Sequence, residues 1–99
     1  MREVRVIRHV TIRGKVQGVG FRAFVEHHAI QRNLAGWVRN RRDDSVEAVF
    51  TGPQVSVDGM IAACKGGPLG ARVDALDQRD ASADEWRGER PGFSVLPTL

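Results

Sequence analysis

The chain reads Gly14-Lys15-Val16-Gln17-Gly18-Val19-Gly20-Phe21-Arg22 at the point where a strand-like pattern gives way to a helical one. Because glycine has no Cβ, a loop with three glycines folds tightly enough to aim several backbone N–H groups at one point. The first N–H groups of the following helix have no partner within that helix and point the same way. The stretch therefore predicts a β-to-α loop that binds an anion the size of phosphate.

The periods of the apolar residues predict the elements on either side of this loop. Val10 and Ile12 alternate with polar residues within 4–13, as in a half-exposed strand. From Phe21 onward the apolar residues recur at steps of three and four until Asn33, which predicts a helix.

The rest of the chain completes a familiar order of elements. We expect strands at 36–41 and 45–51 that form a hairpin, a helix around 57–64, a strand at 71–75, a long polar turn at 77–92 and a last strand at 93–96. The order βαββαβ predicts an α+β fold, a ferredoxin-like sandwich with an antiparallel sheet and two helices on one face. This architecture hosts many unrelated activities, so the site must decide the function.

Length and composition narrow the setting. The 99 residues predict a single domain spanning 1–99, and the formal charge of +3 favours anionic ligands. The single cysteine, Cys64, cannot form an internal disulfide, and no Cys or His spacing fits a zinc site. Met1 to Val10 lack the apolar run of a secretory signal. We therefore expect a cytoplasmic protein with no metal, no cofactor and no membrane partner.

Three separate stretches of the chain form a pattern: the loop from Gly14 to Arg22, the segment Gly36-Trp37-Val38-Arg39-Asn40, and the segment Ser45-Val46-Glu47. Taken together, they resemble the acylphosphatase family. Their order along the chain matches the family, and a weaker likeness continues to Phe93, so the resemblance covers nearly the whole domain.

The resemblance implies a metal-independent hydrolase that converts a small-molecule acyl phosphate to a carboxylate and inorganic phosphate. It implies two catalytic residues: Arg22 binds the phosphate, and Asn40 positions the attacking water. We also expect a monomer that binds no nucleic acid. The substrate-binding loop would consist of Lys15, Val16, Gln17, Gly18, Val19 and Gly20.

Elementary chemistry agrees with these roles. A guanidinium offers a fixed fork of donors that matches two phosphoryl oxygens, and it stays charged at any working pH. An amide both donates and accepts, so it can hold a water and direct its lone pair. The plainer interpretations are a glycine-rich turn without a ligand, a surface arginine at Arg22 and a turn-forming asparagine at Asn40. The loop matches neither the Walker pattern nor G-x-G-x-x-G.

Other reactive side chains fit packing or solvation better than chemistry. Cys64 completes the apolar stripe of the second helix, and adjacent His27 and His28 point to different helical faces, with no carboxylate suitably spaced. His9 is interpreted in the same way, and Trp37 and Trp86 as packing residues. Basic residues near the site predict either a positive rim or a solvated hairpin face: Arg13, Lys15, Arg39, Arg41 and Arg42.

The chain departs from the family pattern in two places. Asp44 follows Asp43 where acylphosphatases commonly have glycine, and a non-glycine residue with positive φ is strained, which could shift Asn40. The segment 95–99 lacks the basic and aromatic ending often seen in the family.

Two alternative functions stay open at this stage. One is an RNA-binding module of the RRM type, which shares the βαββαβ order; Gly20 to Val25 faintly resembles its RNP1 sequence, although RNP1 aromatics belong on the third strand, where only Phe50 is available. The other is an acylphosphatase-like domain that binds a ligand without catalysing its hydrolysis.

Overall fold

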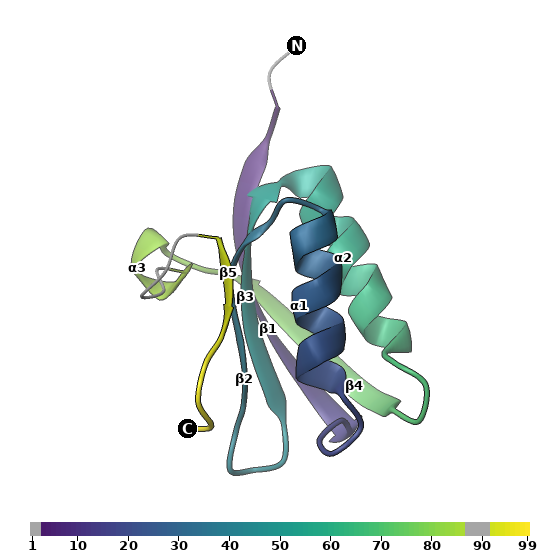
Figure 1. Cartoon of the computed structure of the whole chain (residues 1–99). Coiled ribbons are helices and arrows are strands. Elements are labelled where there is room, and N and C mark those ends of the chain that lie inside the picture. The colour runs from purple at the N-terminus through teal and green to yellow at the C-terminus, as the bar shows by residue number, and fades with distance from the viewer. Residues whose placement is uncertain (1–2, 87–91) are drawn as a thin grey trace.

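The computed structural model describes residues 3–86 and 92–99. Its α+β fold is ferredoxin-like, as predicted, and the last strand expected at 93–96 is present as one strand more than the order βαββαβ contains (Figure 1). In chain order the elements are β1 (Arg5–Lys15), α1 (Phe21–Gln31), β2 (Ala35–Asn40), β3 (Val46–Pro53), α2 (Gln54–Gly66), β4 (Arg72–Asp80), α3 (Ala83–Trp86) and β5 (Phe93–Val95).

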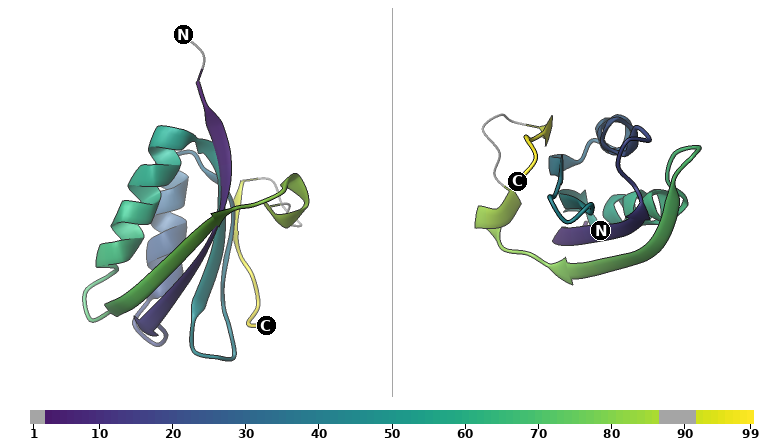
Figure 2. Two further views of the ribbon diagram at one scale, coloured as in Figure 1. Left: turned by 180° about the vertical axis from the view of Figure 1, so that it is seen from behind. Right: turned by 90° about the horizontal axis from the view of Figure 1, so that it is seen from below.

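The strands form one sheet in the order β4-β1-β3-β2-β5. β1 pairs antiparallel with β3 and β4, and β2 pairs antiparallel with β3. α1 and α2 lie side by side on one face (Figures 1 and 2). β5 pairs parallel with β2, so the prediction of a purely antiparallel sheet was wrong at this edge. β4 ends at the same end of the sheet at which β2 begins. The segment that follows β4 therefore reaches the edge beside the start of β2, and β5 runs in the same direction as β2.

Alternation along the strands divides the sheet into an inner face toward the helices and an outer face. Val10 and Ile12 of β1 and Phe50 of β3 point inward and are fully buried. Cys64 of α2 packs in the same core, where burial raises the pKa of its thiol to about 12. The prediction that Cys64 is a core residue is confirmed, and its thiol is too weakly acidic to act as a nucleophile at neutral pH.

β4 is longer than the apolar pattern predicted. The expected turn at 77–92 instead begins with four more strand residues and includes α3, while 87–91 lie outside the described residues. β4 is an edge strand with most of its side chains exposed, so polar residues suit it. Arg8 of β1 holds the C-terminal end of β4: its Nε donates to Oδ1 of Asp80 at 2.9 Å.

α3 covers part of the outer face of the sheet (Figure 2). Trp37 of β2 lies on this face with only 7% of its surface exposed, and its Nε1 donates to the backbone oxygen of Glu85 at 2.7 Å. The prediction that Trp37 packs rather than stacks on a ligand is confirmed. No helix among the described residues has both the length and the apolar character needed to cross a bilayer.

Two aspartates shape the turn between β2 and β3. Asp44 has a φ of 71°, so the strained left-handed conformation predicted for it is present. Asp43 accepts hydrogen bonds from the backbone N–H of Ser45 at 3.1 Å and from its hydroxyl at 2.5 Å. Arg13 of β1 also donates to Asp43, with Nη1 and Oδ2 3.1 Å apart. These bonds hold the turn in one shape despite the strain at Asp44.

We expect Asp44→Gly to raise the free energy of unfolding by about 0.5–1 kcal/mol, because glycine adopts positive φ without a Cβ clash and loses only part of this gain to chain entropy. Urea denaturation of the two proteins measures the difference. Asp44→Ala keeps the Cβ and loses the polar side chain, so it should be less stable than the natural chain. A destabilised glycine variant would show that the aspartate side chain matters more than the strain.

The hydrogen bonds from Ser45 and the charge of Arg13 hold the pKa of Asp43 at about 2, below its ordinary 3.8. A lowered carboxyl pKa stabilises the fold above the unfolded value, and this contribution is lost as pH falls from 3.8 toward 2. Asp43→Ala should therefore lower the urea midpoint relative to the natural chain at neutral pH. The difference between the two midpoints should be smaller near pH 2. Asp77→Ala on the exposed β4 is the control, and a deficit for Asp43→Ala that stays constant with pH would contradict the ionic role.

Candidate active site

The loop between β1 and α1 contains two left-handed glycines. Gly18 has a φ of 73° and Gly20 a φ of 79°, whereas Val19 between them does not have a positive φ. A Cβ at either glycine would meet no atom within 4 Å, so the backbone conformation and not the available space calls for glycine. Alternation between the two hands turns successive N–H groups toward one side, which makes a concave site for an anion.

α1 begins directly after this loop, and its first N–H groups are open. Gly20 has no side chain to cap them, and the first turn contains no acidic residue. The Phe24 N–H donates to the Gly20 carbonyl at 3.0 Å, so the amides of Phe21, Arg22 and Ala23 precede the first complete helical turn. The helix's own side chains therefore leave its positive end without a negative charge.

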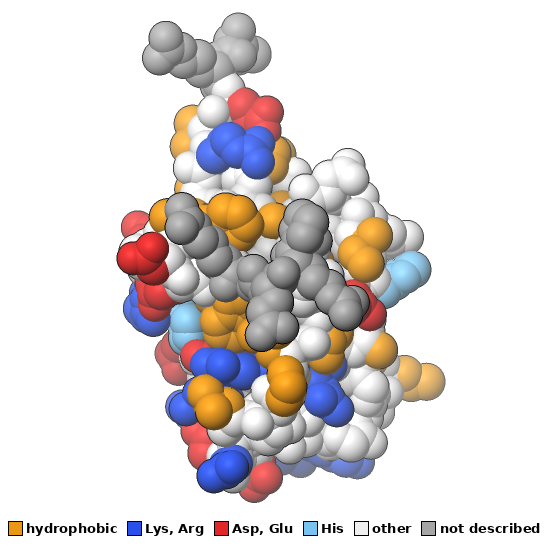
Figure 3. Space-filling view, turned by 60° about the vertical axis from the view of Figure 1, so that its left-hand side comes forward, with side chains coloured by type: hydrophobic (Ala, Val, Ile, Leu, Met, Phe, Trp, Pro, Cys, Tyr) orange, Lys and Arg blue, Asp and Glu red, His pale blue; other side chains and the backbone are white. Residues whose placement is uncertain are grey.

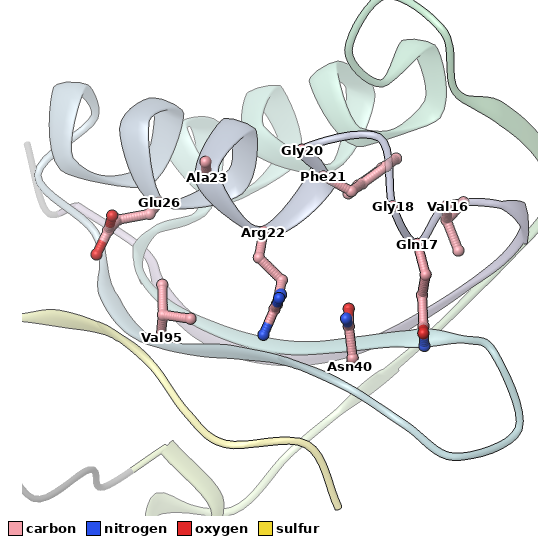
Figure 4. A pocket seen from close by; sticks show the side chains of 10 residues that line it. All are labelled: Val16, Gln17, Gly18, Gly20, Phe21, Arg22, Ala23, Glu26, Asn40 and Val95. Atoms are coloured by element: carbon pink, nitrogen blue, oxygen red, sulfur yellow. The ribbon is translucent and has the colours of Figure 1, made fainter.

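Arg22 adds a cation to this positive end. Its side chain is half-buried and extends from the first turn of α1 toward β2 (Figure 4). Within residues 3–86 and 92–99 no carboxylate forms an ion pair with its guanidinium. A cation at a helix N-terminus is electrostatically unfavourable, and an anion bound between the loop and Arg22 would relieve that repulsion.

Asn40 faces Arg22 from the end of β2. Val38 points toward the helices, so alternation sends Asn40 to the same side (Figure 4). Its backbone is held from both sides, by pairing with Val46 of β3 and by the N–H of Leu99, which donates to the Asn40 carbonyl at 3.2 Å. The C-terminal segment thus supports Asn40 through main-chain bonds, although it lacks the ending typical of the family.

Arg22 and Asn40 line one hollow of about 360 Å³ beside the first turn of α1 (Figure 4). The predicted loop residues that join them in its wall are Val16, Gln17, Gly18 and Gly20. Lys15 and Val19 are not in this wall: Lys15 is exposed at the end of β1, and Val19 packs against the core. The structure therefore brings both predicted catalytic residues together with most of the predicted loop.

Gln17 connects the loop to the hairpin that carries Asn40. Its side-chain Nε2 donates to the backbone oxygen of Arg41 at 2.8 Å and to that of Ser45 at 2.9 Å. Arg41 directly follows β2, and Ser45 directly precedes β3. The amide therefore fixes the distance between the glycine loop and the strand end at Asn40, a structural role that adds to its place in the wall of the hollow.

The predicted positive rim is largely neutralised. On the outer face Glu47 accepts from Arg39 Nε at 2.7 Å, lies 3.4 Å from Arg41 Nη1, and has His9 Nε2 2.7 Å from its other oxygen. Burial alone would raise the pKa of Glu47, but the hydrogen bonds from His9 and Arg39 outweigh it and hold that pKa below its usual value. With Arg13 paired to Asp43, the alternative of an ordinary hairpin face describes these arginines better.

Of the remaining histidines, His27 is exposed and His28 packs against Phe24 on α1. The ring of His28 lies 4.3 Å from that of Phe24, centroid to centroid, and its Nδ1 is 3.2 Å from Arg32 Nη1. Burial and the neighbouring Arg32 lower the pKa of His28. In the described part of the chain no three His, Cys, Asp or Glu side chains gather closely enough to hold a metal ion.

Four residues that line the hollow were not among the predicted site residues: Phe21, Ala23, Glu26 and Val95. Phe21 and Ala23 flank Arg22 in the first turn of α1. Glu26 lies one helical turn after Arg22, and Val95 comes from β5 across the hollow (Figure 4). The spacing of four residues could have identified Glu26, because such pairs share a helix face. No sequence signal could have identified Val95, since its position depends on the parallel pairing of β5 with β2.

Comparison with known proteins gives one consistent result. The Acylphosphatase family model matches residues 8–95. An acylphosphatase of Rhodopseudomonas palustris (strain BisB18) is 55% identical over 96 residues, which cover 95% of this chain and 97% of the relative. An acylphosphatase of Bradyrhizobium diazoefficiens is 54% identical over 97 residues, which cover 96% and 98%.

The likeness extends to three dimensions. The crystal structure of acylphosphatase from Bacillus subtilis superposes with a TM-score of 0.83 and 33% sequence identity, covering 92% of this chain and 98% of that one. The family match over most of the chain, the identity above one half and the shared fold agree with the geometry of the hollow. The chain belongs to the acylphosphatase family, whose members are enzymes that hydrolyse acyl phosphates.

Proposed function

We propose that this enzyme holds the phosphoryl group of its substrate between the Lys15–Gly20 loop and Arg22, and that Asn40 orients the attacking water. The observation that carries the proposal is the shared hollow, in which Arg22 of α1 and Asn40 of β2 approach each other beside two left-handed glycines. Three kinds of donor then converge on one phosphoryl group: the loop amides, the first amides of α1 and the guanidinium.

The reaction suits this set of donors. The water oxygen bonds to phosphorus, the bond from phosphorus to the bridging oxygen breaks, and the electron pair leaves with the carboxylate, while a water proton ends on the phosphate product or in solvent. Charge on the phosphoryl oxygens is stabilised by the fixed donors, which need little reorganisation during the reaction. Asn40 contributes by holding the water in line with the bond that breaks.

The leaving group explains why two such residues suffice. A carboxylate departs without being protonated, so the site needs no general acid for it. The leaving group of a simple phosphate monoester is an alkoxide of far higher basicity. Its departure calls for a metal ion or a general acid. We therefore infer that simple phosphate monoesters are poor substrates and that hydrolysis of acyl phosphates proceeds without a metal ion.

The setting of the enzyme is also proposed. We infer that residues 1–99 act as one domain and as a monomer, in the cytoplasm, without a nucleic-acid partner. The full burial of Phe50 supports the last point, because an RRM-type module needs exposed aromatic rings on its central strands. The alternative of a binding domain without catalysis is separated from the proposed enzyme by turnover of a simple acyl phosphate.

Replacement of Arg22 tests the phosphate site. We expect Arg22→Ala to lower kcat/KM for benzoyl phosphate by about 10³-fold or more, and Arg22→Lys to recover little, because an ammonium cannot reproduce the planar fork. Loss of benzoyl phosphate, followed with a strong chelator present, measures the effect. Arg5→Lys at the far end of β1 is the matched control and should hydrolyse benzoyl phosphate at the natural rate. Near-normal activity of Arg22→Lys would refute the fork, and inactivation by the chelator would reveal a metal.

Replacement of Asn40 tests the division of roles. Asn40→Ala should lower kcat by about 10²-fold, while the inhibition constant of inorganic phosphate changes little, because the amide orients water and does not bind the anion. Steady-state kinetics with phosphate as competitive inhibitor separates the two quantities. Thermal unfolding checks that the variant is folded. A weakened phosphate site with an unchanged kcat would assign Asn40 to binding instead.

A further inference from the structure

The hollow has two chemically different ends. In the view of Figure 4 the side chain of Arg22 lies between Asn40 on one side and Glu26 and Val95 on the other. Asn40 stands at the end closed by Gln17, whose side chain is bonded to two hairpin carbonyls. The other end carries one carboxylate from α1 and one apolar side chain from β5.

In-line geometry decides which end receives the acyl group. In phosphoryl transfer the attacking and leaving oxygens lie on opposite sides of phosphorus. If Asn40 presents the water from its end of the hollow, as proposed above, the bridging oxygen points away from Asn40. The acyl group attached to that oxygen then extends toward Glu26 and Val95. This step rests on the proposed function of Asn40 and Arg22.

Glu26 is available to act on that acyl group. It is half-buried, and within residues 3–86 and 92–99 it takes part in none of the ion pairs. Its position four residues after Arg22 places both charges on one face of α1, yet the two do not form an ion pair with each other. A carboxylate in the wall of an anion site repels any second negative charge on the ligand.

We propose that Glu26 determines substrate specificity by discriminating against acyl groups that carry negative charge, in favour of neutral or positively charged acyl chains. Val95 gives the same end of the hollow an apolar wall, and with 41% of its surface exposed it remains open to contact. On the face of the molecule turned forward in Figure 3, hydrophobic side chains lie among basic and acidic ones. The favoured substrates are therefore phosphates of acids without a further carboxylate or phosphate group.

Benzoyl phosphate and two para-substituted derivatives of opposite charge provide the test, because the three share the benzoyl phosphate framework and differ in the charge of the acyl group. They are 4-carboxybenzoyl phosphate, benzoyl phosphate and 4-(aminomethyl)benzoyl phosphate. In Glu26→Gln, kcat/KM for the carboxy compound relative to benzoyl phosphate should rise about two- to fivefold, and the relative value for the aminomethyl compound should fall by a similar factor. Comparing these relative kcat/KM values between the natural enzyme and Glu26→Gln cancels the different intrinsic reactivities of the three substrates. High salt should shrink both changes.

Matched variants complete the design. Glu26→Asp keeps the charge and should keep most of the natural preference, whereas Asp77→Asn makes the same charge change on exposed β4 and should leave the ratios unchanged. If Glu26→Gln hydrolyses all three compounds with unchanged ratios, the proposed role of Glu26 is overturned, and the proposed function is not. Failure of the natural enzyme to hydrolyse benzoyl phosphate would instead overturn the proposed function, and this inference with it. If Glu26→Gln does not fold, the salt dependence of the natural enzyme's three ratios decides: ratios independent of salt contradict the proposal.

Discussion

The site depends on one electrostatic constraint: positive charge is concentrated at the start of α1 and is not neutralised there. The open amides of the first turn and the guanidinium of Arg22 all repel one another in the absence of an anion. No acidic residue stands in this turn to relieve them. A chain selected for stability alone would place a carboxylate here, so the arrangement is a cost to the fold that the proposed phosphoryl group would offset.

The sheet makes this arrangement possible by separating charges onto its two faces. Residues of β2 alternate, so Asn40 points into the hollow while Arg39 points outward to Glu47. Glu47 therefore pairs with Arg39 and Arg41, the chain neighbours of Asn40, without entering the hollow. The hydrogen bonds from His9 and Arg39, which keep the pKa of Glu47 low despite its burial, show that this carboxylate is held in its charged form on the outer face.

The sequence was most informative where local rules apply. Glycines at 18 and 20, the helix from Phe21, the hairpin and the core position of Cys64 all follow from backbone conformation or residue period. It was least informative where the outcome depends on distant pairing. The second half of β4 was predicted as a turn because an exposed edge strand needs few apolar residues, and the direction of β5 depends on the end of the sheet at which β4 finishes. For the same reason Val95 was absent from the predicted site, whereas the two proposed catalytic residues came from the resemblance and line one hollow in the structure.

The two ends of the hollow suggest how an enzyme this small divides its binding interactions. The proposed phosphoryl end is built from backbone amides, the guanidinium of Arg22 and a loop that Gln17 ties to the hairpin by two hydrogen bonds. The acyl end is formed by Glu26 on a helix surface and Val95 on a three-residue strand, and neither encloses a ligand. Rigid donors where charge develops favour the transition state, and loose contacts elsewhere leave the ground state weakly bound. On our proposal, a single carboxylate at the acyl end would suffice to select acyl groups, because charge acts across an open space where shape cannot.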